Sequence, residues 1–152
     1  MYNDTITLFN RYSSSLGDVW YQTVIHGVDV NMDRANIISK YGVDTSANAT
    51  LHVQFHVQDG EIMIADKKYL PPIAWENQVN DLLSESITFT SGSSFDFFYV
   101  GELDEREEPI ADSAYSPTGF YDYMRKRFDC VYAIESVGGP YTVIPHFEII
   151  GR

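Results

Sequence analysis

The sequence predicts a mainly β protein, a small β-barrel or sandwich of about seven or eight strands with one short helix and long loops. Several segments alternate apolar and polar residues, which is typical of strands with one buried face. Turn signals such as Asp59-Gly60 separate these segments. Aromatic residues make up 14% of the chain, and its 11 Tyr and 9 Phe favour strands.

The chain has the size and composition of one domain. Its 152 residues lie close to the commonest domain length. No internal repeat, low-complexity tract or shift in composition divides the sequence. We therefore expect residues 1–152 to form a single β-rich domain whose core needs no metal or disulfide.

The first predicted hairpin lies near the N-terminus. Residues 5–12 and 19–28 read as strands on either side of a turn at Gly17-Asp18. The second of these strands carries large apolar groups on both faces, so we expect it to be covered on both sides. A short helical turn is expected at residues 33–38, and a polar loop at 43–48.

The most regular strand pattern lies at residues 51–57. One face of this strand carries Leu51, Val53, Phe55 and Val57, and the other carries His52, Gln54 and His56. Asp59-Gly60 then predicts a hairpin turn, after which residues 62–64 return as a strand. Prolines stiffen residues 70–75, which we expect to lead into a short helical or irregular segment ending near residue 80.

The C-terminal half predicts two more hairpins and the helix. Residues 87–90 and 95–100 are expected to form one hairpin, and residues 130–137 and 141–150 another, joined by Gly138-Gly139-Pro140. Between them, Ser116-Pro117 reads as the start of a helix at 117–127. That helix would place Phe120, Met124 and Phe128 on one face and three basic residues in its last turn.

Charge and cysteine content exclude several classes of function. Ten basic and 22 acidic residues give a net charge of −12, which disfavours direct, affinity-driven binding to nucleic acid. Cys130 is the one cysteine, so no intrachain disulfide can form. The first residues lack the regions of a signal peptide, and no apolar run approaches the length of a membrane span. We expect synthesis in the cytoplasm and no membrane partner.

No residue pattern predicts an enzyme, a metal site or a cofactor. His52 and His56 are the best metal candidates. Four strand residues span about 13 Å, however, and zinc binds each imidazole nitrogen at about 2 Å, so one ion cannot bridge the two histidines unless the strand bends. Cys130 could pair with His146 as a nucleophile, yet its neighbours read as the start of a core strand. We therefore predict no catalytic residue, no metal ligand and no cofactor.

Two segments stand out as candidate surfaces. The first is a candidate protein interface at the predicted helix, where aromatic and basic residues are concentrated. Those that the helix cannot bury either contact another chain or fold back under a loop. The interface comprises Tyr115, Phe120, Tyr121, Tyr123, Arg125 and Arg127. The second is an acidic stretch that comprises Glu102, Asp104, Glu105, Glu107 and Glu108. It lacks the spacing of a calcium-binding loop. We interpret it as a solvated loop that is either mobile or lines a channel.

Six segments spread over nearly the whole sequence carry a resemblance: MYNDTITLFNRY (1–12), WYQTVI (20–25), DFFYVG (96–101), GFYDYM (119–124), SVGGPY (136–141) and PHFEI (145–149). Together they are similar to a family of small uncharacterised proteins of tailed phages and prophages of Gram-positive gut bacteria. Such proteins resemble head–tail connectors of the head-closure or stopper class in size and β-rich pattern.

The resemblance implies a virion structural protein of the neck, assembled in the host bacterial cytoplasm. It implies a homo-oligomeric ring of about 6 or 12 copies, with portal or adaptor and tail proteins as partners. DNA would pass through such a ring without being specifically bound, and acidic walls would help it to slide. Two alternatives stay open at this point. One is a tail-terminator or tail-completion protein. The other is a monomeric carbohydrate- or peptide-binding β module that uses Trp20, Trp75 and tyrosines for stacking.

Overall fold

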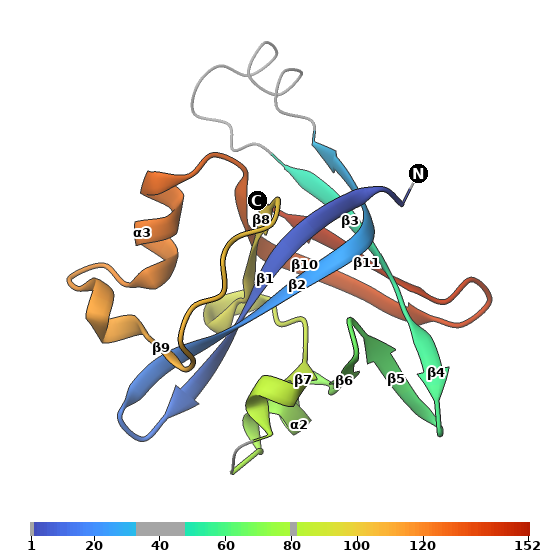
Figure 1. The fold of residues 1–152 in the computed structure, drawn as a ribbon, viewed down its shortest axis with the longest axis horizontal. Coiled ribbons are helices and arrows are strands. Elements are labelled where there is room, and N and C mark those ends of the chain that lie inside the picture. Colours follow the sequence, from blue (N-terminus) through green and yellow to red (C-terminus); the bar gives the residue numbers. More distant parts are fainter. Residues whose placement is uncertain (1, 33–47, 80–81) are drawn as a thin grey trace.

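A computed structural model describes residues 2–32, 48–79 and 82–152 (Figure 1). Within these residues it contains eleven strands and two α-helices. Two predicted segments, the helical turn at 33–38 and most of the polar loop at 43–48, lie outside the described residues. The prediction of a mainly β fold is confirmed.

Six strands close into a barrel, which decides between the barrel and the sandwich. In spatial order they are β1 (Asp4–Ser14), β8 (Phe97–Val100), β10 (Val131–Tyr141), β11 (His146–Gly151), β3 (Ala49–Gln54) and β2 (Gly17–Met32). Long antiparallel pairing of β1 with β2 completes the circle, and each of the other neighbouring pairs is also antiparallel. The short strand β9 (Ile110–Ala111) pairs with β2 outside the barrel.

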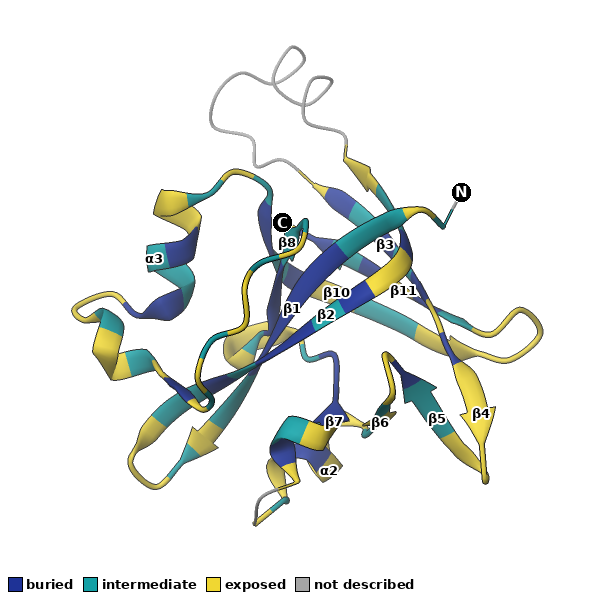
Figure 2. Cartoon of the chain, in the orientation of Figure 1, coloured by how far each residue is buried: buried dark blue, intermediate teal, exposed yellow. Residues whose placement is uncertain are grey.

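Apolar side chains from all six strands fill the barrel interior. Figure 2 colours the ribbon by burial, and buried stretches alternate with less buried ones along the strands. Alternation supplies most of them, as in Ile6 and Leu8 of β1, which are both fully buried. Strand β2 breaks the alternation at Gly27, which has φ +69. Asp4 pairs with Val28 and Thr5 with His26, so Gly27 between them has no partner in β1 and forms a β-bulge. Because of this bulge, Ile25 and Val28 both point into the core although they are three residues apart.

A small second sheet packs against the barrel. It consists of β4 (His56–Gln58), β5 (Glu61–Ile64), β6 (Lys67–Tyr69) and β7 (Ser86–Ile87), and helix α2 (Pro72–Glu76) follows β6. Ile64 and Ile87 of this sheet, together with Phe89, belong to the same buried cluster as the barrel interior. Trp75 of α2 is also buried, and its Nε1 donates to the Arg11 carbonyl at 2.8 Å. The barrel and the small sheet therefore share one core.

Most of the predicted strands are confirmed, but the strand at 51–57 is interrupted. Leu51, Val53 and Phe55 face the core as expected, whereas Val57 is 62% exposed. The backbone leaves the barrel at Phe55, whose N–H donates to the Pro145 carbonyl, and continues as β4 in the other sheet. The apolar face that the sequence predicts for residues 51–57 therefore ends at Phe55, two residues before Val57.

The predicted hairpin of residues 87–90 and 95–100 is wrong. β7 pairs in parallel with β6, and β8 lies between β1 and β10, so the two segments belong to different sheets. The last hairpin exists, but its turn is displaced towards the C-terminus. Gly139, with φ +106, lies within β10 at a register shift between Gly138 and Tyr141, and the chain reverses between β10 and β11.

Candidate functional site

A second buried cluster lies on the outer surface of the barrel. We call it the outer aromatic cluster, and its fully or largely buried members are Phe9, Trp20, Phe97, Ile110, Phe120, Met124 and Val131. The Phe97 ring is 4.8 Å from the Phe9 ring and 4.9 Å from the Trp20 ring, between centroids. This cluster explains why β2 is covered on both sides, as its sequence predicts.

The outer aromatic cluster positions helix α3 (Phe120–Arg127). Phe120 and Met124, four residues apart, are both fully buried and attach the helix to the barrel. The helix begins three residues later than predicted, because Asp112 supplies the acceptor at its N-terminus: its Oδ1 accepts from Phe120 N and from Trp20 Nε1, each at 2.9 Å. Gly119 has φ +95, and a Cβ there would lie 2.8 Å from an Asp112 carboxylate oxygen, so only glycine fits.

The predicted interface residues divide into three groups. Phe120 is fully buried, so its assignment to an exposed interface is wrong. Tyr115, Tyr121 and Tyr123 are half-buried and fold back against the outer aromatic cluster, which was one of the two expected outcomes. Arg125 and Arg127 are exposed. The accessible part of the helix therefore consists of its tyrosine edges and its basic end, without the phenylalanine.

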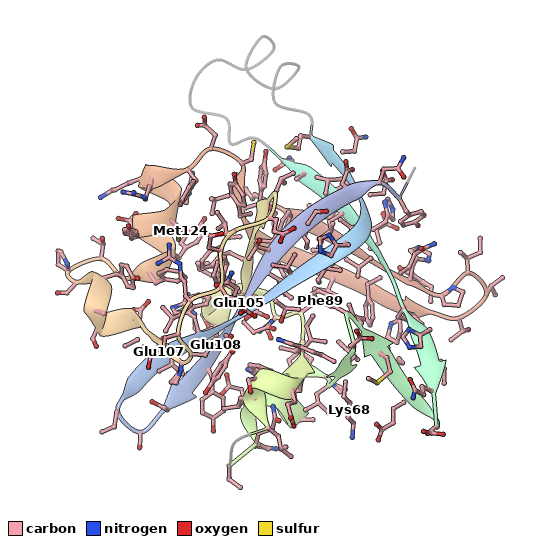
Figure 3. The ribbon with its side chains drawn as sticks, viewed as in Figure 1. Lys68, Phe89, Glu105, Glu107, Glu108 and Met124 are labelled. Atoms are coloured by element: carbon pink, nitrogen blue, oxygen red, sulfur yellow. The ribbon has the colours of Figure 1, made fainter. Side chains whose placement is uncertain are left out.

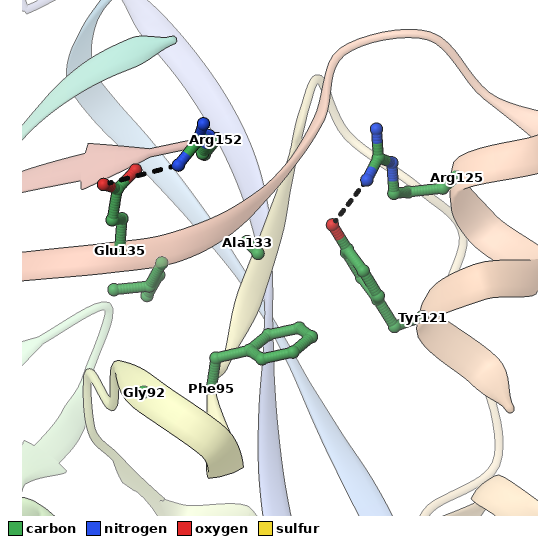
Figure 4. A pocket seen from close by; sticks show the side chains of 8 residues that line it. Gly92, Phe95, Tyr121, Arg125, Ala133, Glu135 and Arg152 are labelled. Carbon is green, nitrogen blue, oxygen red and sulfur yellow. Dashed lines mark hydrogen bonds and ion pairs between the residues drawn. The ribbon is translucent and has the colours of Figure 1, made fainter. Parts of the chain in front are cut away.

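A cleft of about 480 Å³ separates α3 from the barrel wall (Figure 4). We call it the basic cleft; it is lined by Gly92, Phe95, Tyr121, Arg125, Ala133, Ile134, Glu135 and Arg152. The rings of Phe95 and Tyr121 meet edge to face at 4.8 Å and form its aromatic wall. Arg125 Nη1 lies 3.4 Å from Tyr121 Oη, and Arg152 Nη1 lies 3.9 Å from Glu135 Oε1.

The charge around the basic cleft is opposite to that of the whole protein. Arg125, Lys126, Arg127 and Arg152 lie at the end of α3 or in the cleft, in a chain of only ten basic residues. Lys126 pairs with Asp122 at 2.9 Å. For Arg125 and Arg127, no carboxylate oxygen among residues 2–32, 48–79 and 82–152 lies within the 4.0 Å of an ion pair. Of these two, Arg125 lines the cleft beside its aromatic wall and is available to an anionic ligand, whereas Arg127 is not a lining residue and lies over the Tyr123 and Phe128 rings.

Sequence reasoning found only two residues of the basic cleft, Tyr121 and Arg125. It missed Phe95, Glu135 and Arg152, which come from the turn before β8, from β10 and from the last residue of the chain. Arg152 is held there by mutual backbone hydrogen bonds with Ala133, of 2.8 and 3.1 Å. No local pattern signals this convergence, because it depends on the pairing of distant strands.

The acidic loop, residues 102–108, lies against the outside of the barrel (Figure 3). The side chains of Glu102, Asp104, Glu105 and Glu107 are exposed, and that of Glu108 is half-buried. Leu103 N donates to Thr7 Oγ1 at 3.1 Å, and Gln22 Nε2 donates to the Asp104 carbonyl at 3.0 Å. The loop is thus fastened to β1 and β2 while most of its carboxylates face solvent.

Glu108 is the anchor of the acidic loop, and its loss should weaken the fold modestly. Its Oε2 accepts from the backbone N of buried Gln22 at 2.5 Å. Glu108→Ala leaves that N–H without an acceptor, so we expect the free energy of unfolding in urea to fall by about 1–2 kcal/mol. Glu107→Ala removes an exposed carboxylate one residue away and should change it by less than about 0.5 kcal/mol. Equal stabilities of the two variants would show that the anchor contributes nothing.

Lys67 of the small sheet lies beneath the acidic loop. Its Nζ donates to Thr23 Oγ1 at 2.7 Å. Burial lowers the pKa of Lys67, while the charges of Glu108 and Glu105 act in the opposite direction. Glu108 and Glu105 are thus near enough to act on Lys67 electrostatically, although the side chain of Glu105 is exposed.

An apolar patch lies at the turn that joins β10 and β11, at the right of Figure 1. Val143 is 96% exposed, Ile144 65% and Tyr141 46%. We call these three residues the apolar tip. A group of exposed apolar side chains at a projecting turn is a common feature of surfaces that contact other proteins.

Buried Asp96 connects segments that the sequence analysis wrongly joined as a hairpin. Its Oδ1 accepts from Arg11 N at 2.8 Å, and its Oδ2 accepts from Asn10 Nδ2 at 2.9 Å and Thr90 N at 2.8 Å. Its carbonyl accepts from Ile134 N at 2.9 Å. Burial raises the pKa of Asp96 to about 7, although these hydrogen bonds act to lower it.

The histidines and the cysteine form no recognisable centre. His52 lies between Asp29, at 3.7 Å, and Glu148, at 4.0 Å, on the outside of the barrel, and His56 is exposed on β4. Cys130 is half-buried against the barrel core. In the described part of the chain, no group of three or more His, Cys, Asp or Glu could hold a metal ion. No described helix is both long and apolar enough to cross a membrane.

These features define a class: a closed six-stranded β-barrel with a small accessory sheet, a covering helix and a basic cleft at its side. Residues 1–152 match a family described as "Family of unknown function (DUF6751)", and the chain belongs to that family. No curated protein and no solved structure was found to match it.

Proposed function

We propose that this protein is a virion structural protein of a phage neck, a head–tail connector of the head-closure or stopper class. It forms a homo-oligomeric ring of about 6 or 12 copies between portal or adaptor and tail. The phage assignment comes from the resemblance of the six sequence segments. The binding role is carried by the apolar tip, where Val143, Ile144 and Tyr141 are exposed together on a rigid barrel.

The apolar tip favours docking onto another protein over docking onto a small ligand. It projects from a strand pair of the barrel, so it can enter a groove on a neighbour without any change in the fold. We assign the portal or adaptor, or the tail, as that neighbour. The outward carboxylates of the acidic loop support the same role, because an acidic wall repels passing DNA and lets it slide.

The alternative of a monomeric carbohydrate- or peptide-binding module loses part of its basis, namely stacking on Trp20 and Trp75. A carbohydrate-binding module needs aromatic faces that are open to the ligand, and Trp20 and Trp75 are each only 1% exposed. Both indoles donate their Nε1–H inside the protein, to Asp112 and to the Arg11 carbonyl. A tail-terminator would carry the same kind of ring and differs in its neighbour, which an experiment can identify.

Light scattering tests the ring, with the purified 17.3 kDa chain measured alone, with the portal complex and with tail proteins. We expect a particle of about 6 or 12 copies that binds the portal complex. Binding to tail proteins but not to the portal would favour the tail-terminator. A monomer that binds neither would refute the connector.

The apolar tip can be tested by substitution with a matched control. Val143→Asp combined with Ile144→Asp places charges on the docking surface, and we expect co-sedimentation with the portal complex to fall by about tenfold or more. Leu16→Asp is the control, since Leu16 is also 96% exposed at the turn between β1 and β2. The tip hypothesis fails if the double variant binds the portal as well as Leu16→Asp does.

A further inference from the structure

We propose that the basic cleft binds the acidic loop of the next copy of this chain, so that neighbouring subunits meet head to tail. This inference rests on the proposed ring. It identifies which two surfaces of the subunit form the lateral contact, and it names a second copy of the chain as the occupant of the cleft.

The charges of the two surfaces are complementary. The basic cleft presents Arg125 and Arg152 beside an aromatic wall; its acidic lining side chain, Glu135, pairs with Arg152 at 3.9 Å, and Arg125 has no carboxylate partner within 4.0 Å in the described part of the chain. The acidic loop presents exposed carboxylates at Asp104 and Glu107. A guanidinium group binds a carboxylate through paired, charge-assisted hydrogen bonds, so each surface supplies what the other lacks. In a chain with a net charge of −12, a basic cleft is unlike the rest of the surface.

The two surfaces lie on different sides of the outer aromatic cluster. The acidic loop is fastened to β1 and β2, and it runs between α3 and β1 towards β9 in Figure 1. The basic cleft is lined by β10, by the turn before β8, by the last residue of the chain and by α3. No residue belongs to both surfaces.

A contact between two different patches of the same chain leaves one patch free on each end of a dimer. Further copies therefore add in the same direction, and the series closes into a ring when the rotation between copies permits it. A contact of one patch with its own copy would instead stop at a dimer. The separation of loop and cleft thus fits the ring that we propose for the neck.

The aromatic wall gives the cleft more than charge. Exposed ion pairs alone contribute little, because water and salt screen them. Phe95 and Tyr121 form an apolar side to the cleft, and the guanidinium of Arg125 already lies 5.8 Å from the Tyr121 ring centroid. A loop carboxylate that displaces water from this wall would meet the arginines in a less polar environment, where the pairing is stronger.

Reversing the charges on each surface separately tests the contact. The cleft variant carries Arg125→Glu and Arg152→Glu, and the loop variant carries Asp104→Lys and Glu107→Lys. We expect each variant alone to self-associate about tenfold or more weakly than wild type in light scattering, and more so at low salt. All four residues are exposed, so circular dichroism should show both variants folded.

Mixing the two variants provides the decisive measurement. The reversed loop of one variant is complementary to the reversed cleft of the other, and the two wild-type surfaces remain complementary as well. We therefore expect the mixture to assemble as alternating copies, with the mass of the wild-type particle. Glu61→Lys combined with Glu85→Lys gives the loop variant's change in net charge at remote exposed sites, and it should assemble as wild type.

The outcomes separate this inference from the proposed function. If wild type forms a ring and both variants do so equally well, the cleft–loop contact is refuted while the connector stands. A failure of the mixture to assemble, when each variant alone is folded and monomeric, also refutes the pairing. If wild type stays monomeric with and without the portal complex, the ring and the contact are both refuted.

Discussion

Replacing Phe97 by alanine is expected to lower the free energy of unfolding by about 3–5 kcal/mol, the largest effect of a single truncation that we predict. Phe97 is fully buried, and its ring centroid lies within 5.0 Å of those of Phe9, Trp20 and Tyr121. Alanine would leave a cavity beneath α3 that these large rings cannot fill without leaving their own positions. Chemical denaturation followed by tryptophan fluorescence measures the loss.

Two further variants show whether the loss comes from the packing of the outer aromatic cluster. Phe97→Leu keeps most of the volume and should cost less than about 1.5 kcal/mol. Phe95→Ala truncates a half-buried ring at the rim of the same cluster and should cost less than Phe97→Ala, since less apolar surface is lost. An unchanged denaturation midpoint for Phe97→Ala would mean that the Phe97 ring does not pack between the barrel and α3.

The second large effect is a dependence of stability on pH that comes from Asp96. Burial raises the pKa of this carboxyl from 3.8 to about 7. Between these values the unfolded chain has lost the proton while the folded protein keeps it, so stability falls as pH rises. The contribution of Asp96 to the free energy of unfolding is intact at about pH 4 and below and is lost above about pH 7. For this shift in pKa the free energy of unfolding changes by about 4 kcal/mol.

Asp96→Asn removes the titrating group and should flatten this part of the profile. The amide has one acceptor oxygen in place of two, so one of the donors Arg11 N, Asn10 Nδ2 and Thr90 N faces an NH₂ group. We expect the variant to be less stable than wild type at pH 4 and the difference to shrink towards pH 8. Urea denaturation at a series of pH values gives both profiles.

The exposed Asp129→Asn variant is the matched control, because it removes a carboxyl without touching the Asp96 site. Parallel profiles for wild type and Asp96→Asn would show that Asp96 is ionised in the folded protein throughout this range. Such a result would also mean that its three hydrogen bonds outweigh the effect of burial.

Local patterns in the sequence predict the strands that alternate cleanly and the helix that carries Phe120 and Met124 four residues apart. Each of these depends on neighbouring residues alone, and burial then selects the face. The same patterns predict two of the eight residues that line the candidate site, namely Tyr121 and Arg125 on α3. They also place Gly139 in a turn, whereas the structure has it at a register shift within β10. The sequence cannot distinguish the two, because a turn and a bulge both use the positive φ that glycine allows.

Non-local contacts account for what the patterns miss. The parallel pairing of β6 with β7 joins segments separated by α2, and closure of the barrel depends on six strands at once. Asp96 looks like an ordinary turn residue in the sequence, yet it fixes the path between residues 90 and 97 from inside the core. Arg152 reaches the basic cleft only because β11 pairs with β10.

The backbone pairing of Arg152 with Ala133 also determines how the protein can be handled in the laboratory. Any affinity tag or fluorescent fusion joined after Arg152 would start at the opening of the basic cleft, next to Glu135. Such an appendage would compete for the space that we assign to a neighbouring subunit, so a preparation labelled at this end could appear falsely unable to assemble. Labels for assembly experiments belong elsewhere, for example at the exposed turn that contains Leu16.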